Sequence, residues 1–310
     1  MNRTHRLVVS VSLTAGLAAV QIAFGVAAHS TGLMADAGHN LSDVGALILS
    51  LAAVRLALRP PSATRSFGNH RATILAALAN ASLIAVVTAL IVIGSIYRLG
   101  HPGGVRAGTM VVVASLALVV NGAAVLILRD GSSDLNIRAA VLHMVGDALA
   151  SLAVVVAGVV LLIVPTATWL DPGSALVVAA IIVYQAWRVF RGSVAVLLES
   201  TPADVDLDEL TASMVGVPGV DEVHDLHVWS LSSELRLLSA HMVLTGHPTL
   251  EQAQVVSDRV KTAIAGAYSI AHSTLELECE RCIDDEDPCR METLPPTVGS
   301  VHMPGSVHTH

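Results

Sequence analysis

The 310-residue sequence has few charged residues: Asp, Glu, Lys and Arg make up 14% of it, whereas 53% of its residues are hydrophobic. An ordinary soluble domain carries about 25% charged residues, so this composition excludes an ordinary soluble fold and indicates a membrane protein. The charge is also uneven. The first 199 residues hold 12 Arg against 7 Asp and Glu, and the remainder holds 5 Lys and Arg against 18 Asp and Glu. The acidic second part lacks the clustered Lys and Arg that nucleic acids require, so no nucleic-acid partner is expected, and it is suited to attracting cations.

Cysteine is equally scarce. Cys279, Cys282 and Cys289 lie within eleven residues near the C-terminus, and the apolar part has none, so no disulfide framework is predicted. Cys279 and Cys282 have the C-x-x-C spacing that can close on a zinc ion. A cytosolic dithiol with this spacing can also be free, oxidised or loosely metallated, so both cysteines are candidate ligands and no more than that.

The apolar part contains six segments of about 20 residues, the length that a helix needs to cross the hydrocarbon layer. They predict an α-helical membrane protein with six transmembrane helices, over residues 1–199. Arg3 and Arg6 precede the first segment as they would precede a signal peptide, but its length and the similar segments after it indicate a retained helix. Pro- and Gly-containing stretches separate the segments, and one of them, Asp171-Pro172-Gly173, is predicted to be a turn. The segments are residues 7–28, 33–57, 72–98, 107–128, 137–164 and 172–194.

Arginine is unevenly distributed between the two sides of the predicted membrane. Only Arg98 and Arg106 lie on the side opposite the N-terminus, and the other ten lie on the N-terminal side. By the positive-inside rule, and with an even number of spans, both termini are predicted to be cytoplasmic. The ten are Arg3, Arg6, Arg55, Arg59, Arg65, Arg71, Arg129, Arg138, Arg188 and Arg191.

After Glu199 the pattern becomes that of a small soluble domain, predicted over residues 200–283. Helical periodicity and strand-like alternation give the order helix, strand, strand, helix, strand. Thr249 is placed to cap the second of these helices. Residues 284–310 lack periodicity, which predicts a flexible tail. The predicted helices are 206–215 and 250–265, and the predicted strands are 223–229, 235–244 and 273–278.

Acidic and histidine residues inside the apolar segments carry the strongest functional signal, because a charge in the bilayer is costly unless it is paired or faces a polar cavity. His39 and Asp43 in the second segment, and His143 and Asp147 in the fifth, share the spacing His-x-x-x-Asp, which puts both side chains on one helix face. One such pair can be a helix-packing hydrogen bond. Two copies on facing helices would supply two imidazoles and two carboxylates, which match the donors of a tetrahedral Zn²⁺ and balance its charge.

Asp36 lies seven residues before Asp43, about two helical turns away and on a similar face. It is a neighbour of the ligands, a proton carrier, or a residue exposed near the outer end of the helix, and we assign it to the surroundings of the ligands. Gln21, Asn80 and Asn121 are expected to make hydrogen bonds between helices.

Together these motifs resemble those of the cation diffusion facilitators, and most nearly the zinc-transporting branch. The resemblance covers residues 6–280. It includes the six-span layout, the two His-x-x-x-Asp pairs, the stretch SFGNHRATILAAL at 66–78, and VHDLHVWS at 223–230 followed by Ser-Ala-His at 239–241. A short loop over 129–136 without a histidine indicates a bacterial type, which implies a multi-pass protein of the cell inner (plasma) membrane.

The resemblance implies a homodimeric antiporter, not an enzyme, that exports Zn²⁺ from the cytosol in exchange for protons by alternating access. His39, Asp43, His143 and Asp147 match the family's intramembrane transport site, and a histidine at the first of these positions is associated with zinc preference over cadmium. The domain after Glu199 would be similar to a ferredoxin-like, metallochaperone-like fold that dimerises and binds further zinc as a regulatory ligand.

The cytoplasmic ligand positions also rest on this resemblance. His224 and His227 are three residues apart in a predicted strand, so they are expected to point to opposite faces, and only His224 is assigned. Arg71 corresponds to a basic residue of an interlock at the membrane boundary, for which Glu199 is a candidate partner. Arg65 and Asn69 replace the ligands of a loop site that some members have. The residues that match cytoplasmic positions are His224, His241, His272, Glu278, Cys279 and Cys282.

Two other functions fit parts of this pattern. An intramembrane zinc-dependent hydrolase would use zinc and carboxylates, but the chain has no His-Glu-x-x-His motif and no further Glu placed to act as a base. Four protein ligands would also close the site, as in structural zinc centres. A zinc sensor that does not transport would keep the same ligands, and a flux measurement separates it from a transporter.

Overall fold

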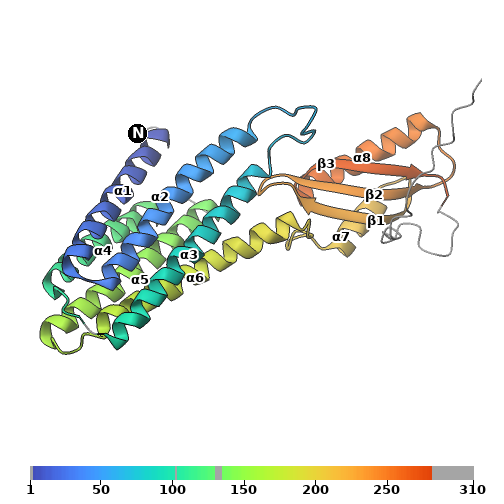
Figure 1. Ribbon diagram of the computed structural model, residues 1–310. Coiled ribbons are helices and arrows are strands. Elements are labelled where there is room, and N and C mark those ends of the chain that lie inside the picture. The colour runs from blue at the N-terminus through green and yellow to red at the C-terminus, as the bar shows by residue number, and fades with distance from the viewer. Residues whose placement is uncertain (1–2, 102, 130–134, 281–310) are drawn as a thin grey trace, which may run out of the picture. The chain divides into compact units, whose positions relative to one another are not determined.

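The computed structural model describes residues 3–101, 103–129 and 135–280. The chain divides into two compact units, with the division after Ser200. Figure 1 shows a helical first unit and a second unit that contains a small sheet. The predicted tail 284–310, together with Cys282 and Cys289, lies outside the described residues.

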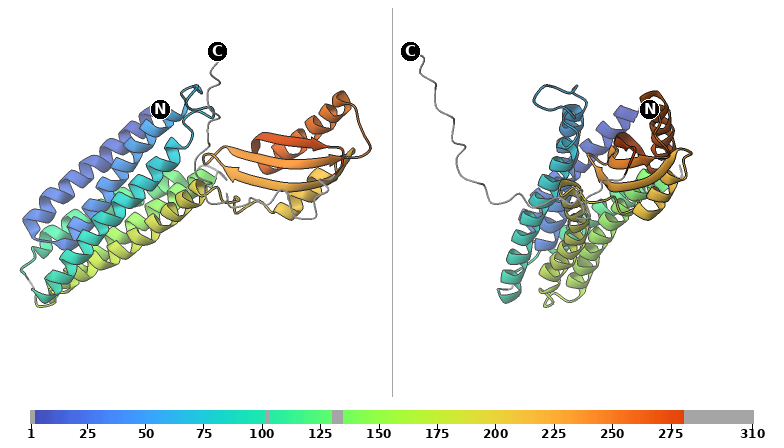
Figure 2. Two further views of the ribbon diagram at one scale, coloured as in Figure 1. Left: turned by 45° about the vertical axis from the view of Figure 1, so that its right-hand side comes forward. Right: turned by 90° about the vertical axis from the view of Figure 1, so that its right-hand side faces the viewer.

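The first unit is built from helices that lie alongside one another, as the views in Figures 1 and 2 show. Over the described residues, four of them are long and apolar enough to cross a membrane: α2, α3, the part of α5 from Met144 to Ile163, and α6. Thr14–Ala28 of α1 and Ala107–Ala123 of α4 are shorter apolar helices. The helices are α1 (Arg3–Ala28), α2 (Thr31–Ala57), α3 (Ala72–Gly100), α4 (Ala107–Arg129), α5 (Leu135–Ile163) and α6 (Leu170–Leu197).

The start of α6 differs from the sequence prediction. Asp171-Pro172-Gly173 is not a turn but the first turn of α6, which begins at Leu170. Proline is tolerated there because the first backbone N–H groups of a helix have no partner within the helix. Asp171 and Pro172 are both buried.

The apolar core residues that the structure describes in the helical unit lie toward one end, where the α1–α2, α3–α4 and α5–α6 turns lie; we call this the turn end. In α2, whose side chains are all described, the buried residues run from Gly32 to Asn40, and Ala53 is the only other one. Many core residues are alanine, which allows neighbouring helices to approach closely. The core residues are Ala28, Leu33, Ala35, Met110, Val113, Ala114, Ala150, Val154, Ala157, Leu161, Ala175, Val178 and Ile182.

The second unit has the predicted order of elements, although its first and third strands each begin three residues earlier than expected. The strands form one sheet in the order β1-β2-β3, with β2 and β3 parallel. The core packs side chains of both helices against side chains of all three strands. The elements are α7 (Leu207–Val215), β1 (Val220–Ser230), β2 (Arg236–Leu244), α8 (Leu250–Tyr268) and β3 (Ile270–Glu278).

Strand β1 is irregular at Asp225, whose φ of 49° is a left-handed conformation. Val223 and Val228 are both buried in the core, although residues five apart in a regular strand face opposite sides. The irregularity therefore acts as a bulge that changes the alternation. The prediction that His224 and His227 point to opposite faces is wrong, because each lies next to a core valine on the strand and both turn away from the core.

Helix α8 begins with a complete capping box, which confirms Thr249 as its N-cap. The Thr249 hydroxyl accepts a hydrogen bond from the Gln252 backbone N–H at 3.4 Å, and the Gln252 side chain accepts one from the Thr249 N–H at 2.9 Å. Two of the N–H groups that a helix start leaves unpaired are satisfied in this way.

We expect Thr249→Ala to destabilise the second unit by about 1 kcal/mol, because the first turn of α8 loses this cap. Hydrogen exchange of the full-length protein should become faster at residues 250–256. Thr262→Ala is the matched control, since the Thr262 hydroxyl contacts only the carbonyl of Asp258 within the same helix. Equal exchange in both variants would contradict the role of the capping box.

Candidate metal centres

The helical unit brings His39, Asp43 and Asp147 together. One ligand atom of each lies within 4.8 Å of the others: His39 Nε2 is 2.8 Å from Asp147 Oδ1 and 3.8 Å from Asp43 Oδ2. The side chains of His39 and Asp147 are 3% and 2% exposed, and that of Asp43 is 22% exposed. An imidazole and two carboxylates thus meet inside an apolar bundle, with one carboxylate nearer to its surface.

The fourth predicted member of this group is His143. It lies in α5 four residues before Asp147, so both residues occupy the same face of the helix. The side chain of His143 lies outside the described part of the chain.

Asp36 is completely buried and bonded to two other helices. Its Oδ2 accepts hydrogen bonds from Gln21 of α1 at 2.6 Å and from Ser151 of α5 at 3.1 Å. The Gln21 carbonyl oxygen in turn accepts one from Asn40 at 2.7 Å. Asp36 is therefore not exposed at the helix end, and the expected interhelical role of Gln21 is confirmed. The network lies about one turn from His39 on α2 and joins the two helices that carry the ligands.

The second unit holds another group, formed by His224 of β1, His241 of β2 and Glu278 of β3, which we call the cytoplasmic group after its predicted location. Their ligand atoms also lie within 4.8 Å of one another. His241 Nδ1 is 2.9 Å from Glu278 Oε1, and His224 Nε2 is 3.5 Å from Glu278 Oε2. Nδ1 of His224 and Oε2 of Glu278 are buried without a hydrogen bond from the described residues. These N and O donors are of the types that zinc binds, so the group fits a metal ion.

Two acidic residues beside this group escaped the sequence prediction. Glu276 Oε2 lies 3.3 Å and Asp225 Oδ2 lies 3.7 Å from His241 Nε2. In the parallel register His241 is directly opposite Glu276, and Glu276 shares a strand face with Glu278 because the two are two residues apart. That alternation was the available signal for Glu276. The position of the Asp225 side chain beside His241 depends on the bulge, which the sequence pattern did not indicate.

The structure does not bring His272 or Cys279 into this group, and Cys282 lies outside the described residues. His272 lies six residues before Glu278 in the same strand, about 20 Å away. Cys279 follows β3 as an exposed free thiol. His227 turns to the same side as His224 but contacts Asp225 at 2.8 Å.

The predicted contact between Arg71 and Glu199 is present within the first unit. The guanidinium of Arg71, which precedes α3, donates a 2.5 Å hydrogen bond to Glu199, which follows α6. Both side chains are substantially exposed, so the pair contributes little to stability by itself. Arg65 donates a hydrogen bond to Asn69 in the α2–α3 loop, where the described residues contain no group of metal-ligand side chains.

Apolar helices that enclose imidazole and carboxylate donors, joined to a small sheet domain with a second group of such donors, are typical of membrane carriers for metal cations. Two family models match the chain, the cation efflux transmembrane domain over residues 7–198 and the cytoplasmic domain of cation efflux proteins over residues 202–280. The chain belongs to the cation efflux family, also called cation diffusion facilitators, as its sequence motifs predicted. This is a family of transporters and not of enzymes, and the chain is accordingly a multi-pass membrane protein.

Curated relatives match over most of their length. The chain is 35% identical to the zinc transporter ZitB of Escherichia coli, over 91% of this chain and 89% of the relative. It is 33% identical to the metal cation efflux system protein CzcD of Cupriavidus metallidurans, over 95% and 92%. It is 30% identical to the cadmium, cobalt and zinc/H(+)-K(+) antiporter of Bacillus velezensis, over 88% and 87%. A solved metal-bound C-terminal domain of CzcD is 34% identical over 24% of this chain and 99% of that chain, with a TM-score of 0.22.

We expect His241→Ala to weaken zinc binding at the cytoplasmic group about tenfold or more. Loss of a residue that only hydrogen-bonds to a metal ligand already lowers metal affinity by about this factor. Titration calorimetry of the detergent-purified full chain would show this as one site lost or weakened. His247→Ala is the control, because the His247 side chain is 71% exposed and, among the described residues, lies near Glu280 outside the group. A His241→Ala titration that matches the unaltered chain would exclude this group as a zinc site.

Proposed function

We propose that the chain exports Zn²⁺ from the cytosol in exchange for protons, by alternating access to a site formed by His39, Asp43, His143 and Asp147. The observation that carries this proposal is the convergence of His39, Asp43 and Asp147 from two helices inside the membrane unit. His143 completes the set from the helix face that it shares with Asp147.

The donor chemistry supports zinc as the substrate. Two imidazoles and two carboxylates suit a tetrahedral Zn²⁺, and the two negative charges offset the cost of placing a dication in an apolar medium. Imidazole donors favour zinc over ions such as Mn²⁺ that prefer oxygen ligands. The relatives named as zinc transporters support the same substrate.

Protons can exchange with zinc because both compete for the same ligand atoms. A histidine must be neutral to bind a metal, and its ordinary pKa of about 6.5 lies near physiological pH. When the site faces a more acidic solution, protonation of the ligands releases the ion. When the site faces the cytosol, loss of these protons restores the zinc-binding form.

The orientation follows from the distribution of arginine. The chain crosses the inner membrane six times with both termini in the cytosol, so the turn end with Arg98 and Arg106 faces the outside. The second unit then lies in the cytosol. It forms a homodimer with a second copy and binds zinc at His224, His241 and Glu278 as a regulatory ligand, and its acidic surface attracts cations toward the membrane.

Removal of one transport carboxylate is expected to lower zinc flux at least about tenfold, because the ion loses both a donor and a balancing charge. Asp43→Asn and Asp147→Asn test this in proteoliposomes that contain a zinc-sensitive dye. Asp221→Asn is the matched control, since Asp221 is an exposed carboxylate of β1. Flux at the control level in both transport-site variants would refute the site.

Proton exchange predicts a pH change inside inverted vesicles. Zinc that enters the lumen should be accompanied by protons that leave it, so luminal pH rises with each addition of zinc, and an acidic lumen accelerates uptake because protonated ligands release the ion. A luminal pH dye measures both effects, and Asp147→Asn should abolish them. Zinc uptake without a change of luminal pH would show that the chain transports zinc by another coupling.

A further inference from the structure

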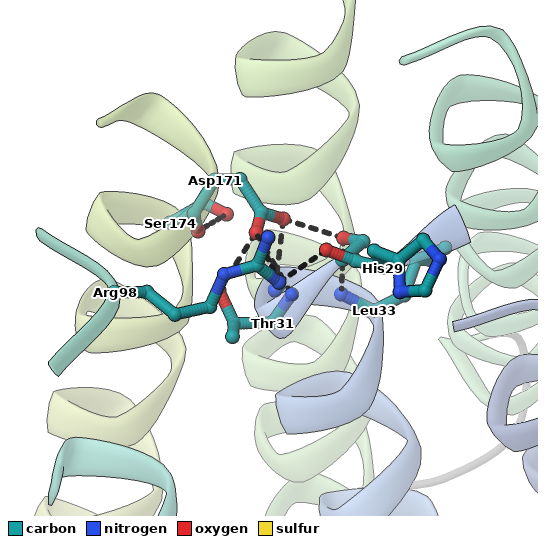
Figure 3. Close-up of polar contacts among 8 residues, drawn as sticks. His29, Thr31, Leu33, Arg98, Asp171 and Ser174 are labelled. Atoms are coloured by element: carbon teal, nitrogen blue, oxygen red, sulfur yellow. Dashed lines mark hydrogen bonds and ion pairs between the residues drawn. The ribbon is translucent and has the colours of Figure 1, made fainter. Parts of the chain in front are cut away.

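Asp171 is a fully buried acid that the proposed transport cycle does not use. Figure 3 shows its carboxylate at the start of α6, directed at the N-terminus of α2. Oδ1 accepts hydrogen bonds from the Ser30 hydroxyl at 2.5 Å and the Gly32 N–H at 3.1 Å. Oδ2 accepts them from the N–H and the hydroxyl of Thr31, at 2.8 and 2.7 Å. Both carboxylate oxygens are thus committed to α2.

This contact caps one helix with a residue from another. The first N–H groups of a helix have no partner within it, and the positive end of the helix dipole attracts a carboxylate. Ser30 caps α2 in the ordinary way by accepting from the Leu33 N–H, and Asp171 takes the N–H groups of Thr31 and Gly32. Separating α2 from α6 at this point would leave a buried charge and several donors without partners, which is strongly unfavourable.

Arg98 of α3 extends the contact to a third helix. Its guanidinium lies 4.0 Å from Asp171 Oδ2 and donates a hydrogen bond to the backbone carbonyl of His29 (Figure 3). His29 has a left-handed conformation, with φ of 53°, in the turn between α1 and α2. We call Arg98, Asp171 and residues 29–32 the clasp, because they tie the α1–α2 turn to α3 and α6.

Gly32 shows how tightly the clasp is packed. A Cβ added there would lie 2.5 Å from the Ser174 hydroxyl oxygen and 3.4 Å from Asp171 Oδ1. The Ser174 hydroxyl already donates a hydrogen bond to the Asp171 backbone carbonyl. Helices α2 and α6 therefore approach as closely as a residue without a side chain allows.

We propose that the clasp holds the turn end of the bundle closed while the transport site faces the cytosol, and that Asp171 and Arg98 are positioning residues for transport. The inference rests on the proposed function. The described apolar core residues lie at the same end as the clasp, and His39 is eight residues along the same helix from Thr31, about 12 Å away. Opening the turn end must part α2 from α6 or α3, so the clasp favours the closed state in the equilibrium between the two states.

The first measurement is access to the closed end. Ala35, fully buried in the core beside the clasp, is changed to cysteine in a full chain whose Cys279, Cys282 and Cys289 are replaced by serine. A membrane-impermeant thiol reagent is added outside spheroplasts. We expect Asp171→Asn to speed labelling of the Ala35→Cys thiol about fivefold or more, because the open state becomes more populated.

The second measurement is a split between KM and Vmax that general loss of folding would not produce. If fewer molecules face the cytosol, the apparent KM for zinc on that side rises, about threefold for a threefold fall in that population, while Vmax changes less. Arg98→Gln should shift labelling and KM in the same direction by a smaller factor. Arg106→Gln is its matched control, because Arg106 is also at the turn end, is exposed, and contacts Ala28 only through its backbone N–H.

The outcomes separate this inference from the proposed function. Labelling requires no zinc movement, so absence of zinc flux in the unaltered chain would defeat the proposed function and leave the labelling test intact. If Asp171→Asn fails to reach the membrane, Arg98→Gln carries the test, since its side chain is partly exposed. The inference would be overturned if every clasp variant that reaches the membrane had the same labelling rate and the same KM as the parent and Arg106→Gln.

Discussion

A polar or charged side chain inside an apolar bundle must find its partners there, and this constraint organises the helical unit. Each buried ionisable side chain described in this unit contacts at least one helix other than its own. The surrounding alanines allow close approach but do not decide which helix meets which, whereas hydrogen bonds have direction and require a particular partner. The contacts join His39 to Asp147, Asp36 to Gln21 and Ser151, and Asp171 to residues 30–32.

The two candidate metal centres bring similar donors together through different secondary structure. In the bundle, the i, i+4 spacing puts His39 and Asp43 on one face of α2, and contact with α5 adds Asp147. In the sheet, neighbouring strands place His224, His241 and Glu278 side by side. The membrane group is enclosed by apolar helices, with the buried Asp36 about one turn away on α2, whereas Glu276 beside the cytoplasmic group is 67% exposed. The two groups therefore differ in how readily water and protons reach them.

Local signals in the sequence predicted most of the fold and the grouping of His39, Asp43 and Asp147. Apolar runs marked the helices, the Thr249 cap is a pattern of adjacent residues, and the His-x-x-x-Asp spacing acts within one helix. Sequence reasoning failed where the cause is not local or is an irregularity of the backbone. The bulge at Asp225 reversed the expected direction of His227, and the register of β2 and β3 was needed to place Glu276 opposite His241. Asp171 was assigned to a turn because its partners are about 140 residues away.

The position of α2 depends on more residues than its candidate metal donors. Gly32, Asp36 and Asn40 make the contacts that locate this helix, and none of them supplies a donor to the group around His39. A change of donor at position 39 therefore alters the chemistry offered to an ion and removes the contact with Asp147, but it leaves the contacts of Gly32, Asp36 and Asn40 in place. Such a separation lets ion preference diverge among descendants of one scaffold by single substitutions, while the architecture that moves the ion is inherited unchanged.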